Sequence, residues 1–125
     1  MTIFVFGNTD IEIDSLPLKI LPQLKEKFPQ IDFEIKDPNE EWLIPEELVI
    51  IDTVLGIENP TVFNSMKEFI TSPRISLHDF DALSNLLYLE KLGKLKKIKI
   101  IGLPPTISEA EAVEEISKFI NSIQP

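Results

Sequence analysis

The apolar residues of this chain fall into short continuous runs and into stripes with the spacing of an α-helix. Three of the runs, at residues 2–6, 48–51 and 97–101, are apolar enough to predict buried strands. A fourth segment, residues 31–36, alternates isoleucine and phenylalanine with charged residues, as a half-buried strand does. We expect the first three strands to lie side by side and parallel at the centre of one sheet.

Three stripes predict helices. The first begins at Ser15, which we expect to cap it, and Pro22 predicts a kink because proline removes an internal hydrogen bond. The second covers residues 80–92. The third has the clearest start, because Ser108 and Glu111 form a capping box. In chain order, the apolar positions of the stripes are Leu16, Ile20, Leu24 and Phe28; Leu83, Leu86 and Leu87; and Val113, Ile116, Ile120 and Ile123.

Two further segments have weaker patterns. Residues 37–47 are acidic and contain two prolines, which predicts a loop. Residues 61–70 are ambiguous, and we favour a short edge strand over residues 61–64. Strands that alternate with helices predict a single α/β domain over residues 1–125. We expect a three-layer sandwich with a mostly parallel, twisted central sheet of phosphorylase/hydrolase-like architecture.

Composition narrows the classes of function. A net charge of −9 is unfavourable for binding nucleic acid, and the one basic cluster, at residues 91–99, is explained as a solubilising surface. No apolar run approaches the roughly 20 residues of a membrane span, and the N-terminus does not resemble a secretory signal. We therefore expect a cytoplasmic monomer. The chain has no cysteine, so only oxygen and imidazole ligands are available to hold a metal ion.

Three polar residues, each just past a different apolar stretch, form the candidate site: Asp14, Asp52 and His78. Asp52 directly continues the run at residues 48–51, and His78 is the only histidine of the chain. The carboxyl ends of parallel strands gather at one edge of an α/β sheet, where ligands bind. Two carboxylates and an imidazole meeting there would suit a divalent transition metal.

Each of these residues also has a purely structural interpretation. Asp14 follows a strand, where aspartate is common as a turn former or helix cap. His78 alone is more often packed or hydrogen-bonded than a metal ligand. For Asp52 the two interpretations are balanced, because a carboxylate at the end of a buried run needs either a partner or the open mouth of a site.

The order of these elements resembles that of the hydrogenase maturation endopeptidases, over about residues 2–122. In that family a strand leads to a Gly-Asn turn and then to an acidic ligand at the start of the first helix, matching Gly7-Asn8 and Asp14. A buried strand then ends in a second aspartate with a glycine soon after, matching Asp52 and Gly56. A Ser/Thr-x-His segment before a leucine-rich helix matches His78, and a final strand ends in Gly-x-x-Pro here as well.

The resemblance implies an endopeptidase that removes the C-terminal extension of a nickel–iron hydrogenase large-subunit precursor after nickel insertion. Asp14, Asp52 and His78 would be both its metal-recognising and its catalytic residues, the nickel would come with the precursor, and no organic cofactor is implied. Two alternatives stay open: a non-catalytic α/β binding module, and a degenerate relative that binds the precursor without cleaving it. The second rests on the first loop, which has Ile13-Asp14-Ser15 where the family usually has two adjacent acidic residues and then a glycine.

Overall fold

A five-stranded sheet forms the centre of the protein in a computed structural model that describes residues 1–7, 10–36, 42–71, 80–94 and 96–123. The strand order is β2-β1-β3-β5-β4, and every neighbouring pair is parallel except β4 and β5. The strands are β1 (Thr2–Val5), β2 (Asp32–Ile35), β3 (Glu47–Thr53), β4 (Thr61–Phe63) and β5 (Lys97–Leu103). The three predicted central strands are therefore the adjacent, parallel strands β1, β3 and β5, although Lys97 and Lys99 of β5 are exposed.

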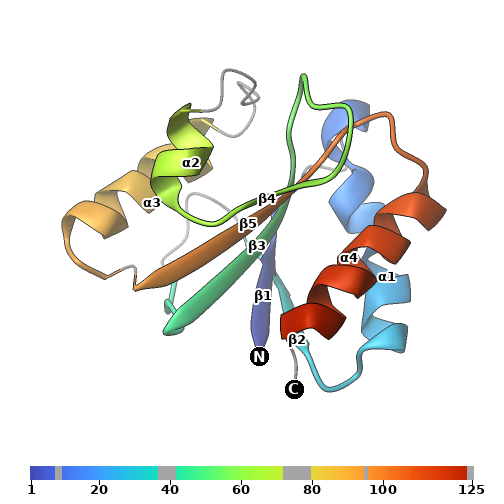
Figure 1. Cartoon of the computed structure of the whole chain (residues 1–125), viewed down its shortest axis with the longest axis horizontal. Helices are drawn as coiled ribbons and strands as arrows, with labels where there is room; N and C mark the ends of the chain where they lie inside the picture. Colours follow the sequence, from blue (N-terminus) through green and yellow to red (C-terminus); the bar gives the residue numbers. More distant parts are fainter. Residues whose placement is uncertain (8–9, 37–41, 72–79, 95, 124–125) are drawn as a thin grey trace.

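Helices cover both faces of the sheet, which confirms the α/β class and its three layers (Figure 1). Helices α1 and α4 lie on one face, and α2 and α3 lie on the other. Successive residues of a strand point to opposite faces, so Val49 and Ile51 pack beneath α1 and α4, whereas Leu48 and Ile50 pack beneath α2 and α3. The helices are η1 (Glu12–Asp14, a 3-10 helix), α1 (Leu16–Lys27), α2 (Met66–Thr71), α3 (Phe80–Lys91) and α4 (Glu109–Ile123).

The start of α1 differs from the prediction. The Ser15 side chain does not cap this helix; its hydroxyl instead donates a 2.7 Å hydrogen bond to the carbonyl oxygen of Glu12. The reason is that η1 directly precedes α1, so the backbone of Ser15 is already helical and its hydroxyl turns back to η1. Helix α1 continues through Pro22. The predicted start of α4 is confirmed, because the Glu111 N–H donates to Oγ of Ser108 at 3.1 Å.

Helix α2 was not predicted, although the edge strand before it was. Its start has the same chemistry as that of α4: the Glu68 N–H donates to Oγ of Ser65 at 3.1 Å, and the Glu68 carboxylate accepts from the Asn64 N–H at 2.6 Å. Serine followed three residues later by glutamate is a capping box, so a sequence signal for α2 existed. Within the described ranges, no helix is both long enough and apolar enough to cross a membrane.

Candidate functional site

The parallel strands β1, β3 and β5 end at one edge of the sheet, the upper edge in Figure 1, which we call the carboxyl edge. Three connections gather there: residues 10–15, which contain η1, residues 54–60 and residues 104–108. Because ligands of open α/β sheets bind beyond the carboxyl ends of the strands, this edge is where the sequence places its candidate site.

Asp52 lies inside β3, since the strand extends two residues beyond the predicted run to Thr53. It is opposite Gly102 of β5 and only 3% exposed. Its Oδ1 accepts a 2.8 Å hydrogen bond from the backbone N–H of Thr53, which offsets part of the cost of burying a carboxylate. By strand alternation Asp52 belongs to the face covered by α2 and α3, where Ile50 and Val54 also pack.

Gly102 allows the closest packing beside Asp52. A Cβ on Gly102 would lie 2.8 Å from Cγ2 of Val54 and 3.1 Å from Cε2 of Phe63. The first contact is shorter than real side chains show and the second is tighter than most, so Val54 and Phe63 occupy the space that another residue would need. The glycine therefore sets how closely β4 and the β3–β4 connection approach the strand end that carries Asp52.

Asp14 is the last residue of η1 and is 7% exposed. Its N–H donates to the carbonyl oxygen of Ile11 at 3.0 Å, which closes the 3-10 turn. Its own carbonyl oxygen lies above Gly7, where a Cβ would be only 2.9 Å away, and the Leu18 side chain of α1 closes the same space at 3.1 Å. Asp14 thus approaches the end of β1 from the side of α1.

The fold brings Asp14 and Asp52 to the same edge, because η1 packs against β3. The third candidate, His78, lies outside the described residues, as does Asn8 of the Gly-Asn turn. Over the ranges the structure describes, no group of three or more histidine, cysteine, aspartate or glutamate side chains could hold a metal ion. A cation shared by Asp14, Asp52 and His78 therefore stays a prediction.

Thr53 is a buried polar residue beside the candidate site that the sequence analysis did not select. It is 2% exposed, and its hydroxyl oxygen has no hydrogen-bond partner in the described structure. Strand alternation places it with Ile51 and Leu103 on the face covered by α1 and α4. The signal in the sequence was its position: it directly follows Asp52 and continues the same strand.

The three connections at the carboxyl edge are negatively charged, although Lys36, directly after the parallel strand β2, adds a positive charge at the same edge. The connections at residues 10–15, 54–60 and 104–108 contain Asp10, Glu12, Asp14 and Glu58 but no lysine or arginine. The first turn of α4, which also begins at this edge, adds two glutamates. Such a surface favours a cation or a positively charged segment over an anion.

The fold matches solved structures across nearly its full length. It is similar to the hydrogenase maturating endopeptidase HybD from E. coli, with a TM-score of 0.66 and 18% identity, covering 98% of this chain and 91% of that one. The chain has the fold of hydrogenase maturation endopeptidases. A hydrogenase 3 maturation protease matches with a TM-score of 0.63 at 15% identity, covering 100% of this chain and 92% of that one.

An uncharacterized protein from Wolinella succinogenes matches equally well, with a TM-score of 0.65, 15% identity and 98% of both chains covered. No protein-family model matches the chain, and no curated protein matches its sequence. At identities this low the likeness shows the fold alone.

Proposed function

We propose that the protein is an endopeptidase that removes the C-terminal extension of a nickel–iron hydrogenase large-subunit precursor after nickel insertion. The observation that carries this proposal is the likeness of fold to hydrogenase maturation endopeptidases over nearly the whole chain. It is supported by two aspartates at the carboxyl edge, both within the sequence pattern that resembles this family. We expect the protein to act as a single-domain monomer in the cytoplasm.

In this proposal the nickel belongs to the substrate, and Asp14, Asp52 and His78 engage it from the protease side. The donor set is chemically suited to the ion, because carboxylate oxygens and an imidazole nitrogen bind divalent nickel. A divalent metal supplies polarisation of a carbonyl group or a lower pKa for an attacking water. The negative edge around the two aspartates would favour approach of the cationic centre.

The protein's own contribution is to hold the carboxylates in place before the substrate arrives. Asp52 is held by its position inside a paired strand and by the N–H of Thr53. Asp14 is held by the 3-10 turn and by the close contact of its backbone with Gly7. Preorganised groups of this kind lose little entropy when a ligand binds, which favours recognition of one precise metal geometry.

The decisive experiment uses a hydrogenase large-subunit precursor, with and without nickel. The purified protein is incubated with each form, and intact-mass spectrometry follows loss of the C-terminal extension. We expect cleavage of the nickel-loaded precursor only. Failure to cleave a loaded precursor that a known maturation protease does cleave would rule out the proposed activity.

The first loop favours one competing function. Its Ile13-Asp14-Ser15 segment stands where the family usually has two adjacent acidic residues and then a glycine, and this suits a degenerate relative that binds the precursor without cutting it. Such a protein would co-elute with the nickel-loaded precursor in size-exclusion chromatography and leave its mass unchanged. A non-catalytic module unrelated to hydrogenases would neither bind nor cut.

A further inference from the structure

The amino-terminal edge of the sheet, opposite the candidate site, contains a groove of about 770 Å³. Its walls come from the starts of β1, β3 and β5 and from the connection between β4 and α2. Leu48, Met66 and Ile98 contribute apolar surface, and Lys96, Lys97 and Lys99 contribute positive charge. A volume of this size is typical of specific ligand sites.

The groove lies where the sheet is incomplete. Strand β4 pairs with β5 only over Ile100–Gly102, and the chain then turns away into α2. Continued at the same register, β4 would place Asn64 opposite Lys99 and Ser65 opposite Ile98. The turn at this point has a clear cause, because the Asn64 N–H is bound by the Glu68 carboxylate.

The first half of β5 therefore has an open edge. Lys97 donates its N–H to the carbonyl oxygen of Glu46, toward β3, at 3.3 Å. Consecutive residues of a strand direct their backbone groups to opposite sides, so the N–H and C=O of Ile98 face the side where β4 has ended. In the described part of the chain no strand pairs with Ile98 on that side. Such an edge is a template for an added strand.

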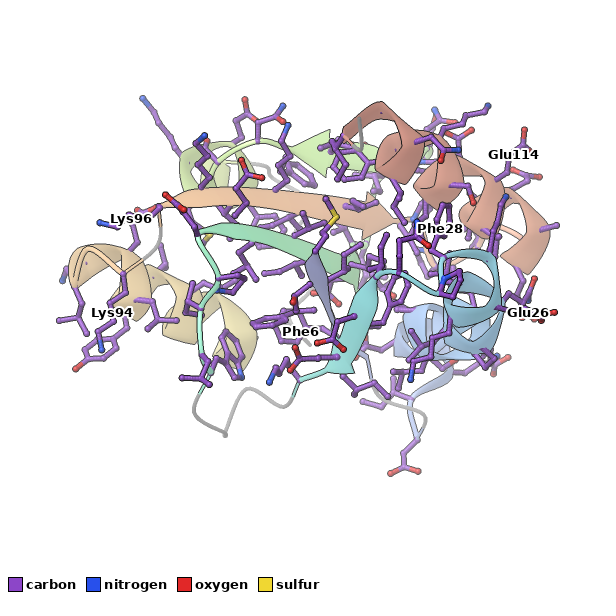
Figure 2. All side chains as sticks on the ribbon, turned by 90° about the horizontal axis from the view of Figure 1, so that it is seen from below. Phe6, Glu26, Phe28, Lys94, Lys96 and Glu114 are labelled. Carbon is purple, nitrogen blue, oxygen red and sulfur yellow. The ribbon has the colours of Figure 1, made fainter. Side chains whose placement is uncertain are left out.

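The positive charge at this edge indicates which kind of partner the groove would bind. Five of the twelve lysine and arginine residues of the chain lie within residues 91–99, although the net charge is −9. Figure 2, which looks at the molecule from below, shows Lys94 and Lys96 on one side and Glu26 and Glu114 on the other. Lys97 and Lys99 on an open edge disfavour pairing with the same edge of a second copy, and they favour an acidic partner.

Two carboxylates, Glu47 and Glu90, also line the groove and reduce its net positive charge. Glu47 lies 3.6 Å from the Lys97 ammonium, but their side chains are 69% and 74% exposed, so the pair contributes little stability and a partner's carboxylate can replace it. Lys99 donates to the side-chain Oδ1 of Asn64 at 3.2 Å. The N–H groups of the Asn64 side-chain amide are then available to an acceptor.

We propose that this groove binds an extended acidic segment of another protein, which adds to β5 as a strand at Ile98. Along the added strand, residues beside Lys97 and Lys99 would be acidic, and the alternate residues would be apolar and pack near Met66 and Ile98. The proposal concerns a second surface, remote from the carboxyl edge, and does not depend on the proteolytic function.

The test uses an acetylated and amidated peptide in which Glu and Val alternate, titrated into the full chain and followed by fluorescence anisotropy. Hydrogen exchange of individual backbone amides is then measured by NMR with and without the peptide. We expect the Ile98 amide to exchange readily in the free protein and to become protected by the peptide. The Ile100 amide, already on the paired part of the β5 edge, should change little.

Two variants with the same loss of charge separate the groove from general attraction. Lys97→Gln/Lys99→Gln should weaken binding by roughly tenfold or more, whereas Lys91→Gln/Lys94→Gln, outside the groove, should weaken it by about twofold at most. A peptide of alternating Lys and Val should not bind.

Four outcomes would overturn the proposal. The first is no binding of the acidic peptide, and the second is binding that both double variants weaken equally without protection of Ile98. The third is a concentration-dependent dimer in size-exclusion chromatography that Lys97→Gln/Lys99→Gln dissociates, which would make the groove a contact between two copies. Free glutamate reproducing the protection of Ile98 would likewise exclude strand addition, since it has no extended backbone.

Discussion

The carbonyl oxygen of Asp14 lies 2.9 Å from the point where a side chain on Gly7 would begin. The end of β1 and the last residue of η1 are therefore in contact through a space that only glycine leaves free. This contact couples the first strand to one of the two candidate carboxylates, and it gives a direct way to test whether the position of η1 matters for activity.

Gly7→Ala should displace η1 and lower cleavage of the nickel-loaded precursor by at least about tenfold. The added methyl group meets backbone rather than a flexible side-chain end, so we also expect about 1–3 kcal/mol of destabilisation. Gly93→Ala is the matched control. Nothing lies within 4 Å of its added Cβ, but its φ of +72° makes alanine unfavourable by roughly 1–2 kcal/mol. If Gly7→Ala and Gly93→Ala lose activity equally, the loss is explained by lower stability and not by displacement of η1.

Asp52→Asn should abolish cleavage while the fold stays intact. Asparagine keeps an oxygen to accept the Thr53 N–H, and the loss of charge relieves any repulsion from Asp14 in the absence of metal, so the melting temperature should hold or rise. Asp52→Ala removes the acceptor and should lower stability by about 1–3 kcal/mol. Asp10→Asn, which removes an exposed charge at the same edge, should still cleave. If Asp52→Asn is destabilised but still cuts, Asp52 has only a structural role.

Thr53→Val should raise the free energy of unfolding by about 1 kcal/mol, because it replaces a buried hydroxyl that lacks a hydrogen bond with a methyl group of the same shape. Chemical denaturation measures this directly. Thr53→Ser, which keeps the hydroxyl and loses a methyl group, should be destabilised. A less stable Thr53→Val variant would contradict the prediction and indicate that the hydroxyl binds an internal water.

Gly102→Ala should lower stability by about 1–3 kcal/mol, since its Cβ would meet Val54 at 2.8 Å and Phe63 at 3.1 Å. The double variant Gly102→Ala/Val54→Ala vacates most of that space. We therefore expect it to be less destabilised than the sum of the two single variants, as denaturation of all four proteins would measure. Strict additivity would mean that the two residues do not compete for the same space.

The sequence alone determined the strands and helices whose pattern is unambiguous. Residues 48–51 had to be a buried strand, because so short an apolar run satisfies its backbone only within a covered sheet. In residues 97–101 the isoleucines at 98, 100 and 101 marked the second strand, whose lysines are exposed. The start of α4 was equally clear from Ser108 and Glu111. The short helix α2 was missed, since a helix of six residues has too few positions for a periodic stripe, even though Ser65 and Glu68 marked its beginning.

Only the tertiary structure decided how the carboxyl edge is arranged. Sequence order suggested that Asp14 and Asp52 would lie at the ends of strands, but not that they approach from different sides of the sheet. That difference follows from the extension of β3 through Asp52 beside β5, which by strand alternation places Asp52 on the face of α2 and α3, and from Gly7, which admits η1 on the face of α1. Strand pairing and close backbone contacts join residues far apart in the chain, so no local pattern encodes them.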